Sequence, residues 1–204
     1  MSRLFYVIGN PIEHSLSPVI HAAFAQKAGL DIHYEKLLFA VEDFAGQLRR
    51  LLAAEPVYGA NVTVPFKREA YKACTTISER ARLAGAVNTL SFQKGGVVFG
   101  DNTDGIGFVN DLKRLYGGNL SEARLLLLGA GGAARGLLAV LPTYVRAVTI
   151  ANRTQAKAFD LAETFGVSAS SLEATKNGTW EIVVNATSAS LSDAVPAVDP
   201  GVFA

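Results

Sequence analysis

The sequence predicts an α/β protein in which strands and helices alternate around mainly parallel sheets. Short apolar runs that end in turn residues recur along the chain, as in LFYVIG at residues 4–9. Segments with helical spacing of apolar residues lie between them, as in VEDFAGQLRRLLAAE at residues 41–55. The segment LLLLGAGGAARG at residues 125–136 predicts a strand buried on both faces, a tight turn and a helix. This alternation favours sheets that carry helices on both faces.

The first part of the chain shows its elements in a clear order. In the predicted helix 17–29, Pro18 occupies a first-turn position and Gly29 is a stop signal. AVNTLSFQ (86–93) and VVFGD (97–101) flank a Lys94-Gly95-Gly96 turn and predict a hairpin. The other expected elements are strands at 4–9, 34–39 and 58–64 and a helix at 41–55.

The second part of the chain repeats the strand–helix order. Residues 103–117 predict a helix that leads from a first domain into a second, and Gly117-Gly118-Asn119 ends it. The expected elements after it are strands at 124–129, 146–151, 167–169 and 180–187 and helices at 132–141 and 154–165. We therefore expect a substrate-binding catalytic domain at 1–103 and a Rossmann (doubly wound) dinucleotide-binding domain at 104–204.

Composition excludes several function classes. The 204 residues are 50% hydrophobic, and 19 basic against 18 acidic residues form no run of like charge. This balance predicts neither a nucleic-acid groove nor a membrane-binding patch. The lone Cys74 excludes an internal disulfide and suits a reducing compartment, and we see neither a signal peptide nor a membrane-spanning stretch. We expect a cytoplasmic protein with a small-molecule substrate; because its three histidines lack metal-ligand spacing, we predict no metal site.

The glycine-rich turn is the main indication of a cofactor. It stands between a predicted strand and a predicted helix, where its backbone can approach a pyrophosphate that faces the helix N-terminus. The alternative is a tight turn that binds nothing. The predicted cofactor-binding residues in this turn are Gly129, Ala130, Gly131, Gly132 and Ala133.

The residues after the next strand discriminate between cofactors. An NAD site usually has an acidic residue about 20 positions beyond the glycines, to bind the ribose 2′-hydroxyl. Asn152, Arg153 and Thr154 stand there instead, and Arg153 can bind a 2′-phosphate and stack on adenine. The sequence therefore predicts NADP, with Lys157 as a weaker phosphate partner. The alternative is that Arg153 is a solvated charge at the sheet edge.

Four polar clusters follow predicted strand ends, where ligands bind in open α/β sheets. Hydroxyls, amides and a lysine with an aspartate suit a small polyhydroxylated acid, although each cluster taken alone is more often turn chemistry. Ser15 and Ser17, two residues apart, can face one way toward a carboxylate. The remaining candidates are Thr63, Lys67, Asn88, Thr103 and Asp104.

The motifs GNPIEHSLSPVIH, NVTVPFK, AGAVNTL, GDNTDGIG, GAGGAARG, ANRT and NATS occur in this order. With them, the chain resembles the shikimate dehydrogenase family from about residue 5 to residue 190. The resemblance implies reversible reduction of 3-dehydroshikimate to shikimate by NADPH in aromatic amino-acid biosynthesis.

The resemblance also implies roles for individual residues. Ser15 and Ser17 would bind the substrate carboxylate, and Lys67 with Asp104 would form the catalytic pair. Asp104 would also hold a ring hydroxyl, together with Thr63, Asn88 and Thr103. Thr187, in the NATS motif, would lie in the loop that approaches the nicotinamide.

Hydride addition to a ketone builds negative charge on oxygen, which a nearby ammonium group can stabilise and protonate. Lys67 can supply that ammonium, and Asp104 can orient both Lys67 and a substrate hydroxyl. The negative charge of Asp104 favours protonated Lys67 and burial opposes it, so the sequence leaves the balance open.

Two departures from the family pattern qualify this expectation. Ser190 stands where NATSxG has glycine, and 75 residues follow Gly129, room for four strands where a complete fold has six. We therefore expect a C-terminally truncated, incomplete Rossmann domain, a monomer or homodimer whose sheet edge near Val183 invites self-association. The alternatives are a catalytically impaired fragment that binds ligand only, a quinate/shikimate dehydrogenase that also accepts quinate or NAD, and a distant relative of methylene-tetrahydrofolate dehydrogenase.

Overall fold

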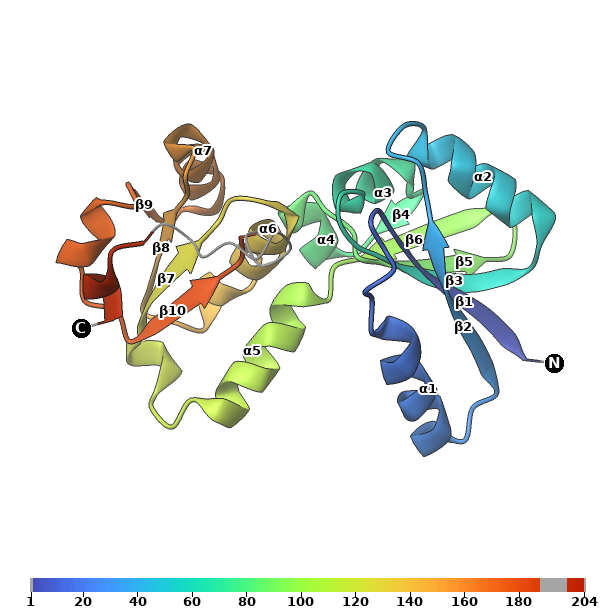
Figure 1. The fold of residues 1–204 in the computed structure, drawn as a ribbon, viewed down its shortest axis with the longest axis horizontal. Helices are drawn as coiled ribbons and strands as arrows, with labels where there is room; N and C mark the ends of the chain where they lie inside the picture. The colour runs from blue at the N-terminus through green and yellow to red at the C-terminus, as the bar shows by residue number, and fades with distance from the viewer. Residues whose placement is uncertain (1, 188–197, 204) are drawn as a thin grey trace. The chain divides into compact units, whose positions relative to one another are not determined.

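The computed structural model describes residues 2–187 and 198–203 (Figure 1). Contacts between Cα atoms divide the chain into two compact units, Met1–Thr103 and Asp104–Ala204. We call them unit 1 and unit 2 and describe each by itself. Ser190 lies outside the described residues.

Unit 1 is built on a six-stranded sheet in the order β2-β1-β3-β5-β6-β4. The pairs β1–β2, β1–β3 and β4–β6 are parallel, whereas β5 runs antiparallel to β3 and β6. The predicted hairpin is therefore present, and the sheet is mainly parallel. The elements are β1 (Arg3–Gly9), α1 (Ser17–Ala28), β2 (Ile32–Leu38), α2 (Phe44–Ala54), β3 (Val57–Val62), α3 (Lys67–Ala73), β4 (Thr76–Ile77), α4 (Glu79–Ala84), β5 (Thr89–Gln93) and β6 (Val97–Asp101).

The two faces of this sheet differ in chemistry. On one face, Ile8 and Val62 pack with Phe44 of α2 and with Phe66, which precedes α3. Burying an apolar side chain of this size stabilises the fold by about 1.5–3 kcal/mol. The helix α1 lies on the opposite face (Figure 1). That face carries the polar side chains of Tyr34 and Asn61, which are hydrogen-bonded to one another.

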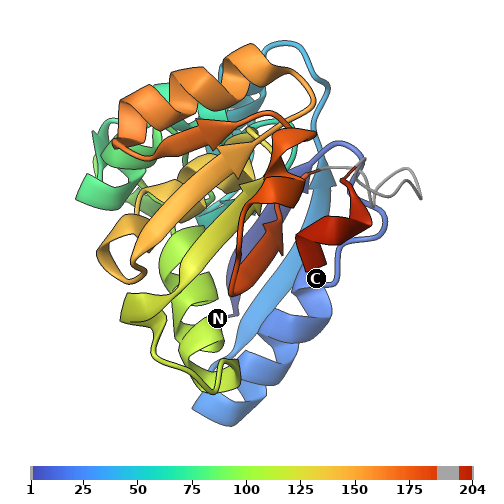
Figure 2. The ribbon, with the colours of Figure 1, turned by 90° about the vertical axis from the view of Figure 1, so that its left-hand side faces the viewer.

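Unit 2 contains a four-stranded parallel sheet in the order β10-β7-β8-β9. Figure 2 shows these strands side by side. The order reverses between β7 and β10, as in one half of a doubly wound dinucleotide-binding fold. The elements are α5 (Asp104–Leu115), β7 (Arg124–Leu128), α6 (Gly132–Leu138), β8 (Ala147–Ala151), α7 (Gln155–Phe165), β9 (Ser168–Ser170), β10 (Ile182–Asn185) and the short 3-10 helices η1 (Leu120–Glu122), η2 (Leu141–Thr143), η3 (Ala174–Asn177) and η5 (Pro200–Phe203).

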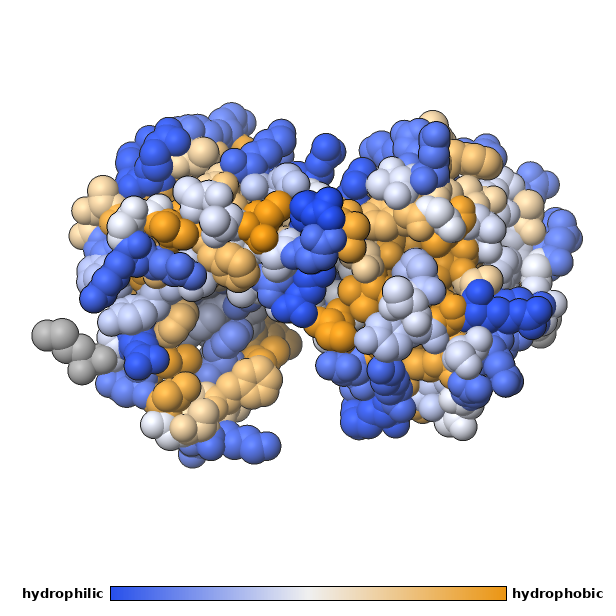
Figure 3. Space-filling model, turned by 180° about the vertical axis from the view of Figure 1, so that it is seen from behind, coloured by the Kyte–Doolittle hydropathy of each residue, from blue (hydrophilic) through white to orange (hydrophobic). Residues whose placement is uncertain are grey.

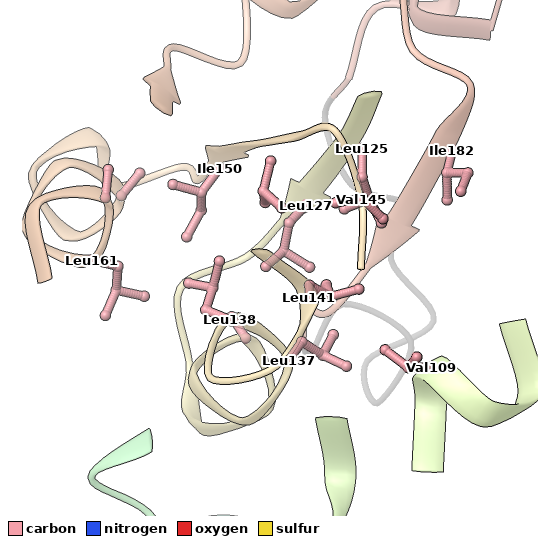
Figure 4. Close-up of a cluster of buried hydrophobic side chains, with 14 of the residues drawn as sticks. Val109, Leu125, Leu127, Leu137, Leu138, Leu141, Val145, Ile150, Leu161 and Ile182 are labelled. Carbon is pink, nitrogen blue, oxygen red and sulfur yellow. The ribbon is translucent and has the colours of Figure 1, made fainter. Parts of the chain in front are cut away.

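The leucine run of β7 is buried on both faces, as predicted. Leu125 and Leu127 pack in the core shared with α5, α6 and α7 (Figure 4). Leu126 and Leu128 face the other way and pack with Val202 of η5. All four leucines are at most 2% exposed. A central strand of a parallel sheet needs apolar residues at every position for this reason.

Some predicted boundaries differ from the structure, and one strand was missed. The helix expected at 132–141 ends at Leu138. Pro142 has no N–H to donate to the Leu138 carbonyl and its ring would clash with that carbonyl, and a short 3-10 helix follows. The strand expected at 180–187 spans Ile182–Asn185, with Trp180 bound through its ring nitrogen to the Thr175 carbonyl. The two-residue strand β4 was absent from the prediction, being too short to show a period.

The surface of both units includes hydrophobic residues, which are orange in the space-filling view (Figure 3). In unit 1, Val19, Ile20 and Phe24 of α1 are exposed. Within the described ranges, no helix has the length and apolar character needed to cross a membrane.

Candidate active site and cofactor-binding turn

Most substrate-binding candidates lie where strands of unit 1 end. Ser15 follows β1, and its Oγ accepts a hydrogen bond from the main-chain nitrogen of Ser17 at 3.3 Å, at the start of α1. Thr63 directly follows β3, and its main-chain nitrogen donates to the Ile8 carbonyl at 2.9 Å. The ends of β1 and β3 are therefore adjacent, and their polar residues occupy one end of the sheet.

Asn88 is the centre of a hydrogen-bonded cluster at the same sheet. Its side chain is buried; Nδ2 donates to Thr103 Oγ1 at 3.1 Å, and Oδ1 accepts from the Thr103 main-chain nitrogen at 3.0 Å. Thr89 Oγ1 also donates to Asn88 Oδ1, at 2.8 Å. The structure thus brings Asn88 and Thr103 together, although 15 positions separate them.

Lys67 is the first residue of α3 and is half-buried. Its carbonyl accepts a hydrogen bond from the Val87 nitrogen at 2.8 Å, which places its main chain beside the loop that carries Asn88. Asp104 is the first residue of α5 and follows Thr103 directly. Because Lys67 belongs to unit 1 and Asp104 to unit 2, the pairing of their side chains stays a prediction.

An ion pair that sequence reasoning missed anchors the loop before Asp104. Asp101 Oδ1 accepts from Arg80 Nε at 2.7 Å, from Ser78 Oγ and from the main-chain nitrogen of Asn102. A second Arg80 nitrogen pairs with Asp101 Oδ2. The hydrogen bonds from Arg80 hold the pKa of Asp101 below its ordinary value. Arg80 and Asp101 lie 21 positions apart, and no sequence motif or periodicity links them, so the sequence offered no signal for this contact.

Asn61 was also missed. Its Nδ2 donates to the Asn88 carbonyl at 3.3 Å and to Thr89 Oγ1 at 3.4 Å. Residues two apart on a strand share a face, so the position of Asn61 two residues before Thr63 could have indicated it.

In unit 2, Gly129 ends β7 with a backbone that only glycine adopts readily. Its φ is +109°, and a Cβ added there would lie 2.8 Å from the main-chain atoms of Ala186. Its nitrogen donates to the Ala151 carbonyl at 2.8 Å, and the Ala186 nitrogen donates to the Leu128 carbonyl at 2.8 Å. These bonds draw the ends of β7, β8 and β10 together.

The remaining residues of the turn leave its outer side accessible. Gly131 caps α6, and a Cβ added there would meet no described atom within 4 Å. Ala130 is half-buried against the core, Gly132 begins α6, and Ala133 is exposed in the first turn of that helix. The open space at Gly131 is the close approach that a pyrophosphate requires.

The other four cofactor candidates lie in two loops, which follow β8 and β10, the strands on either side of β7. After β8, Asn152 Nδ2 donates to the Thr154 carbonyl at 3.0 Å, and the exposed Arg153 stands between them. Arg153 has no ion-pair partner within the described part of the chain. After β10, Thr187 Oγ1 donates to Asn185 Oδ1 at 2.7 Å. The loops after β7 and β10 lie at the point where the strand order reverses, the position at which such folds bind dinucleotides.

Comparison with known proteins identifies the family. The model of the shikimate dehydrogenase substrate binding domain matches residues 7–90, and that of shikimate / quinate 5-dehydrogenase matches residues 111–192. A relative from Shewanella halifaxensis (strain HAW-EB4), named shikimate dehydrogenase (NADP(+)), is 47% identical over 208 residues, which cover 100% of this chain and 74% of the relative. The chain belongs to the shikimate dehydrogenase family. A second relative of the same name, from Dechloromonas aromatica (strain RCB), is 48% identical and aligns with 100% of this chain and 76% of its own length.

Solved structures of the shikimate dehydrogenase family share the fold. Shikimate dehydrogenase from Aquifex aeolicus superposes with a TM-score of 0.86 at 35% identity, over 98% of this chain and 74% of that one. Shikimate 5-dehydrogenase from Thermus thermophilus, in complex with NADP(H) and shikimate, gives a TM-score of 0.83 at 38% identity, over 97% and 72%. These comparisons support an α/β fold with a Rossmann-like nucleotide-binding domain for this shikimate dehydrogenase family member.

The residues of unit 2 fit the cofactor of this family. The open space at Gly131 can admit a pyrophosphate, and the positive charge of Arg153 suits a 2′-phosphate, which an acidic residue would repel. No cluster of three His, Cys, Asp or Glu residues among the described positions could hold a metal ion.

Proposed function

We propose that this protein is an NADP-dependent oxidoreductase that reversibly reduces 3-dehydroshikimate to shikimate. The observation that carries the proposal is the cluster around Asn88, which gathers amide and hydroxyl groups at one end of the unit 1 sheet. Such a cluster suits a compact polyhydroxylated ring. The named relatives align along the whole chain, and one solved neighbour holds both shikimate and NADP(H). The cytoplasmic location stays a prediction from the single cysteine.

The proposed substrate contacts divide into two ends. Ser15 and Ser17 bind the carboxylate through their hydroxyl groups. Thr63, Asn88 and Thr103 hold the ring hydroxyls, and Asp104 completes this second group. Because Asn88 and Thr103 are already hydrogen-bonded to one another, they need little reordering to receive a ligand.

The proposed chemistry rests on Lys67. The nicotinamide supplies or accepts the hydride when the cofactor is bound. The Lys67 ammonium stabilises the negative charge that develops on the substrate oxygen and provides its proton. Asp104 orients Lys67 and a substrate hydroxyl. In the oxidation direction, Lys67 receives the hydroxyl proton.

Lys67→Ala tests the catalytic role. We expect kcat for NADPH formation from shikimate to fall by about 10²–10⁴-fold, because a positioned acid–base group contributes an effect of that size. Lys72→Ala is the matched control, because Lys72 is an exposed lysine of the same helix. Unchanged turnover in Lys67→Ala would contradict the role of Lys67. A wild-type chain that binds shikimate without forming NADPH would favour the alternative of a binding-only fragment.

Arg153→Ala tests the cofactor assignment. We expect the NADP affinity to fall about tenfold and the NAD affinity to stay unchanged, because a phosphate contact by a guanidinium is lost in one case only. Measuring dissociation constants for both cofactors checks this. An equal loss for both would contradict 2′-phosphate recognition. Initial rates with quinate in place of shikimate would reveal the broader specificity.

We further propose that the outer edge of β10 permits self-association. β10 is the first strand of the sheet order and pairs with β7 alone among the described strands. Within the described residues, its outer edge has no strand beside it and presents main-chain donors and acceptors that a second chain can pair with. Sedimentation velocity over a concentration series should show a rising dimer fraction. A constant monomer at every concentration would contradict the proposal.

A further inference from the structure

Tyr34 of β2 reaches the substrate site although it belongs to none of the motifs. In the parallel register, Tyr34 pairs with Phe5 and Asn61 pairs with Val7. Phe5 and Val7 are two apart on β1, so the side chains of Tyr34 and Asn61 lie on the same face of the sheet. The Tyr34 hydroxyl donates to Asn61 Oδ1 at 2.6 Å.

Two residues of α1 complete the surroundings of Tyr34. The His21 ring stacks on the Tyr34 ring with centroids 4.3 Å apart and planes 8° from parallel. Ser17 lies within hydrogen-bonding reach of the Tyr34 hydroxyl, and His21 within reach of Asn61. Burial raises the pKa of Tyr34, with the Ser17 interaction opposing the rise, so the phenol stays neutral.

Asn61 connects Tyr34 to the hydrogen-bonded cluster around Asn88. Asn61 Nδ2 donates to the Asn88 carbonyl and to Thr89 Oγ1, and Thr89 in turn donates to Asn88 Oδ1. Asn88 binds Thr103. Tyr34 therefore stands between Ser17, proposed for the carboxylate, and the cluster proposed for the ring hydroxyls.

We propose that Tyr34 is a positioning residue that fixes the Ser17 hydroxyl relative to the Asn61–Asn88 cluster and so sets the spacing between the two ends of the substrate site. The inference rests on the proposed function, from which it takes shikimate as the ligand. A carboxylate accepts the Ser17 proton. The Tyr34 hydroxyl can then turn its own proton to Ser17 Oγ, while His21 donates to Asn61 Oδ1 in its place. Every polar group keeps a partner, and the chain of donors points at the carboxylate.

Tyr34→Phe removes the hydroxyl and keeps the ring on His21. We expect the dissociation constant for shikimate, measured by titration calorimetry, to rise about threefold to tenfold, because one hydrogen bond and the ordering of Ser17 are lost. The KM for shikimate rises in parallel, whereas kcat and the NADP dissociation constant stay within about twofold. Tyr6→Phe is the matched control: it removes the bond from Tyr6 to Glu55 Oε1, 2.7 Å long, on the opposite face of the same sheet.

A double-mutant cycle with Ser17→Ala separates positioning from simple packing. If Tyr34 acts through Ser17, Tyr34→Phe has less than half of its effect in the Ser17→Ala background. Additive effects, or an unchanged shikimate dissociation constant in Tyr34→Phe, would overturn the inference and leave the proposed function standing. A wild-type chain that fails to bind shikimate would refute the proposed function, and the ligand named here with it. Equal weakening in Tyr6→Phe would show a general loss of stability and would also overturn the inference.

Discussion

The two units prepare their sites in different ways. In unit 1, side chains form the candidate site: Asn88 binds Thr103, and Asn61 donates to the Asn88 carbonyl, between segments that are far apart in sequence. In unit 2, the backbone forms it: Gly129 turns with positive φ, and Gly131 leaves open space at the start of α6. A small ligand with many hydroxyls needs individually placed polar groups, whereas a pyrophosphate needs a close main chain. Substitutions should therefore affect the units differently.

Gly129→Ala should have the largest effect. The added Cβ meets main-chain atoms of Ala186 at 2.8 Å, and alanine disfavours a φ of +109°. We expect the free energy of unfolding of unit 2 to fall by about 2–4 kcal/mol. Urea unfolding monitored by the fluorescence of Trp180, the single tryptophan, measures it. A stability equal to wild type would show that the turn can relax without its glycine.

Asn88→Ala should have the next largest effect, and in unit 1 only. It removes the acceptor of the Thr103 nitrogen and the donor to Thr103 Oγ1 from a buried cluster. We expect a loss of about 1–3 kcal/mol in stability and at least tenfold weaker shikimate binding, with NADP binding unchanged. Calorimetric titration with each ligand checks this. Equal weakening of shikimate binding and NADP binding would contradict the assignment of the two ligands to separate units.

Asp101→Asn should show a smaller effect that depends on pH. The folded-state pKa of Asp101 is lowered, chiefly by Arg80, so the ionised group favours the folded state. This contribution is complete above the ordinary value of 3.8 and disappears as the pH falls through the lowered folded value. Wild type should therefore exceed Asp101→Asn in stability at pH 7, and the difference should shrink below about pH 4. A difference independent of pH would contradict the ion-pair explanation.

Gly131→Ala should have the smallest effect on stability. Nothing described lies within 4 Å of the added Cβ, and φ is −93°, so unfolding should change by less than about 1 kcal/mol. The NADP dissociation constant should nevertheless rise about tenfold, because the methyl group occupies the space proposed for the pyrophosphate. An unchanged NADP dissociation constant would contradict the placement of the pyrophosphate at Gly131. Together with Gly129→Ala, this pair separates the folding role of the turn from its binding role.

Local patterns predicted much of the fold. The apolar runs marked the longer strands, Gly29 ends α1 in a left-handed conformation, and the leucine run is a strand buried on both faces. One prediction was wrong because two local signals competed. Apolar spacing favoured a helix to residue 141, whereas Pro142 opposes its continuation, and the helix ends at Leu138. The two-residue β4 exists only through its pairing with β6 and has no pattern of its own.

The strand–helix alternation, the glycine turn and the presence of Arg153 in place of an acid follow from the sequence alone. Each depends on residues that are neighbours along the chain, where backbone preferences and spacing act directly. The pairing of Arg80 with Asp101 and the contact of Tyr34 with Asn61 required the tertiary structure, because these partners lie 21 and 27 positions apart. Such contacts depend on strand order and register, and the register of β1 with β2 and β3 is what places Tyr34 and Asn61 on one face.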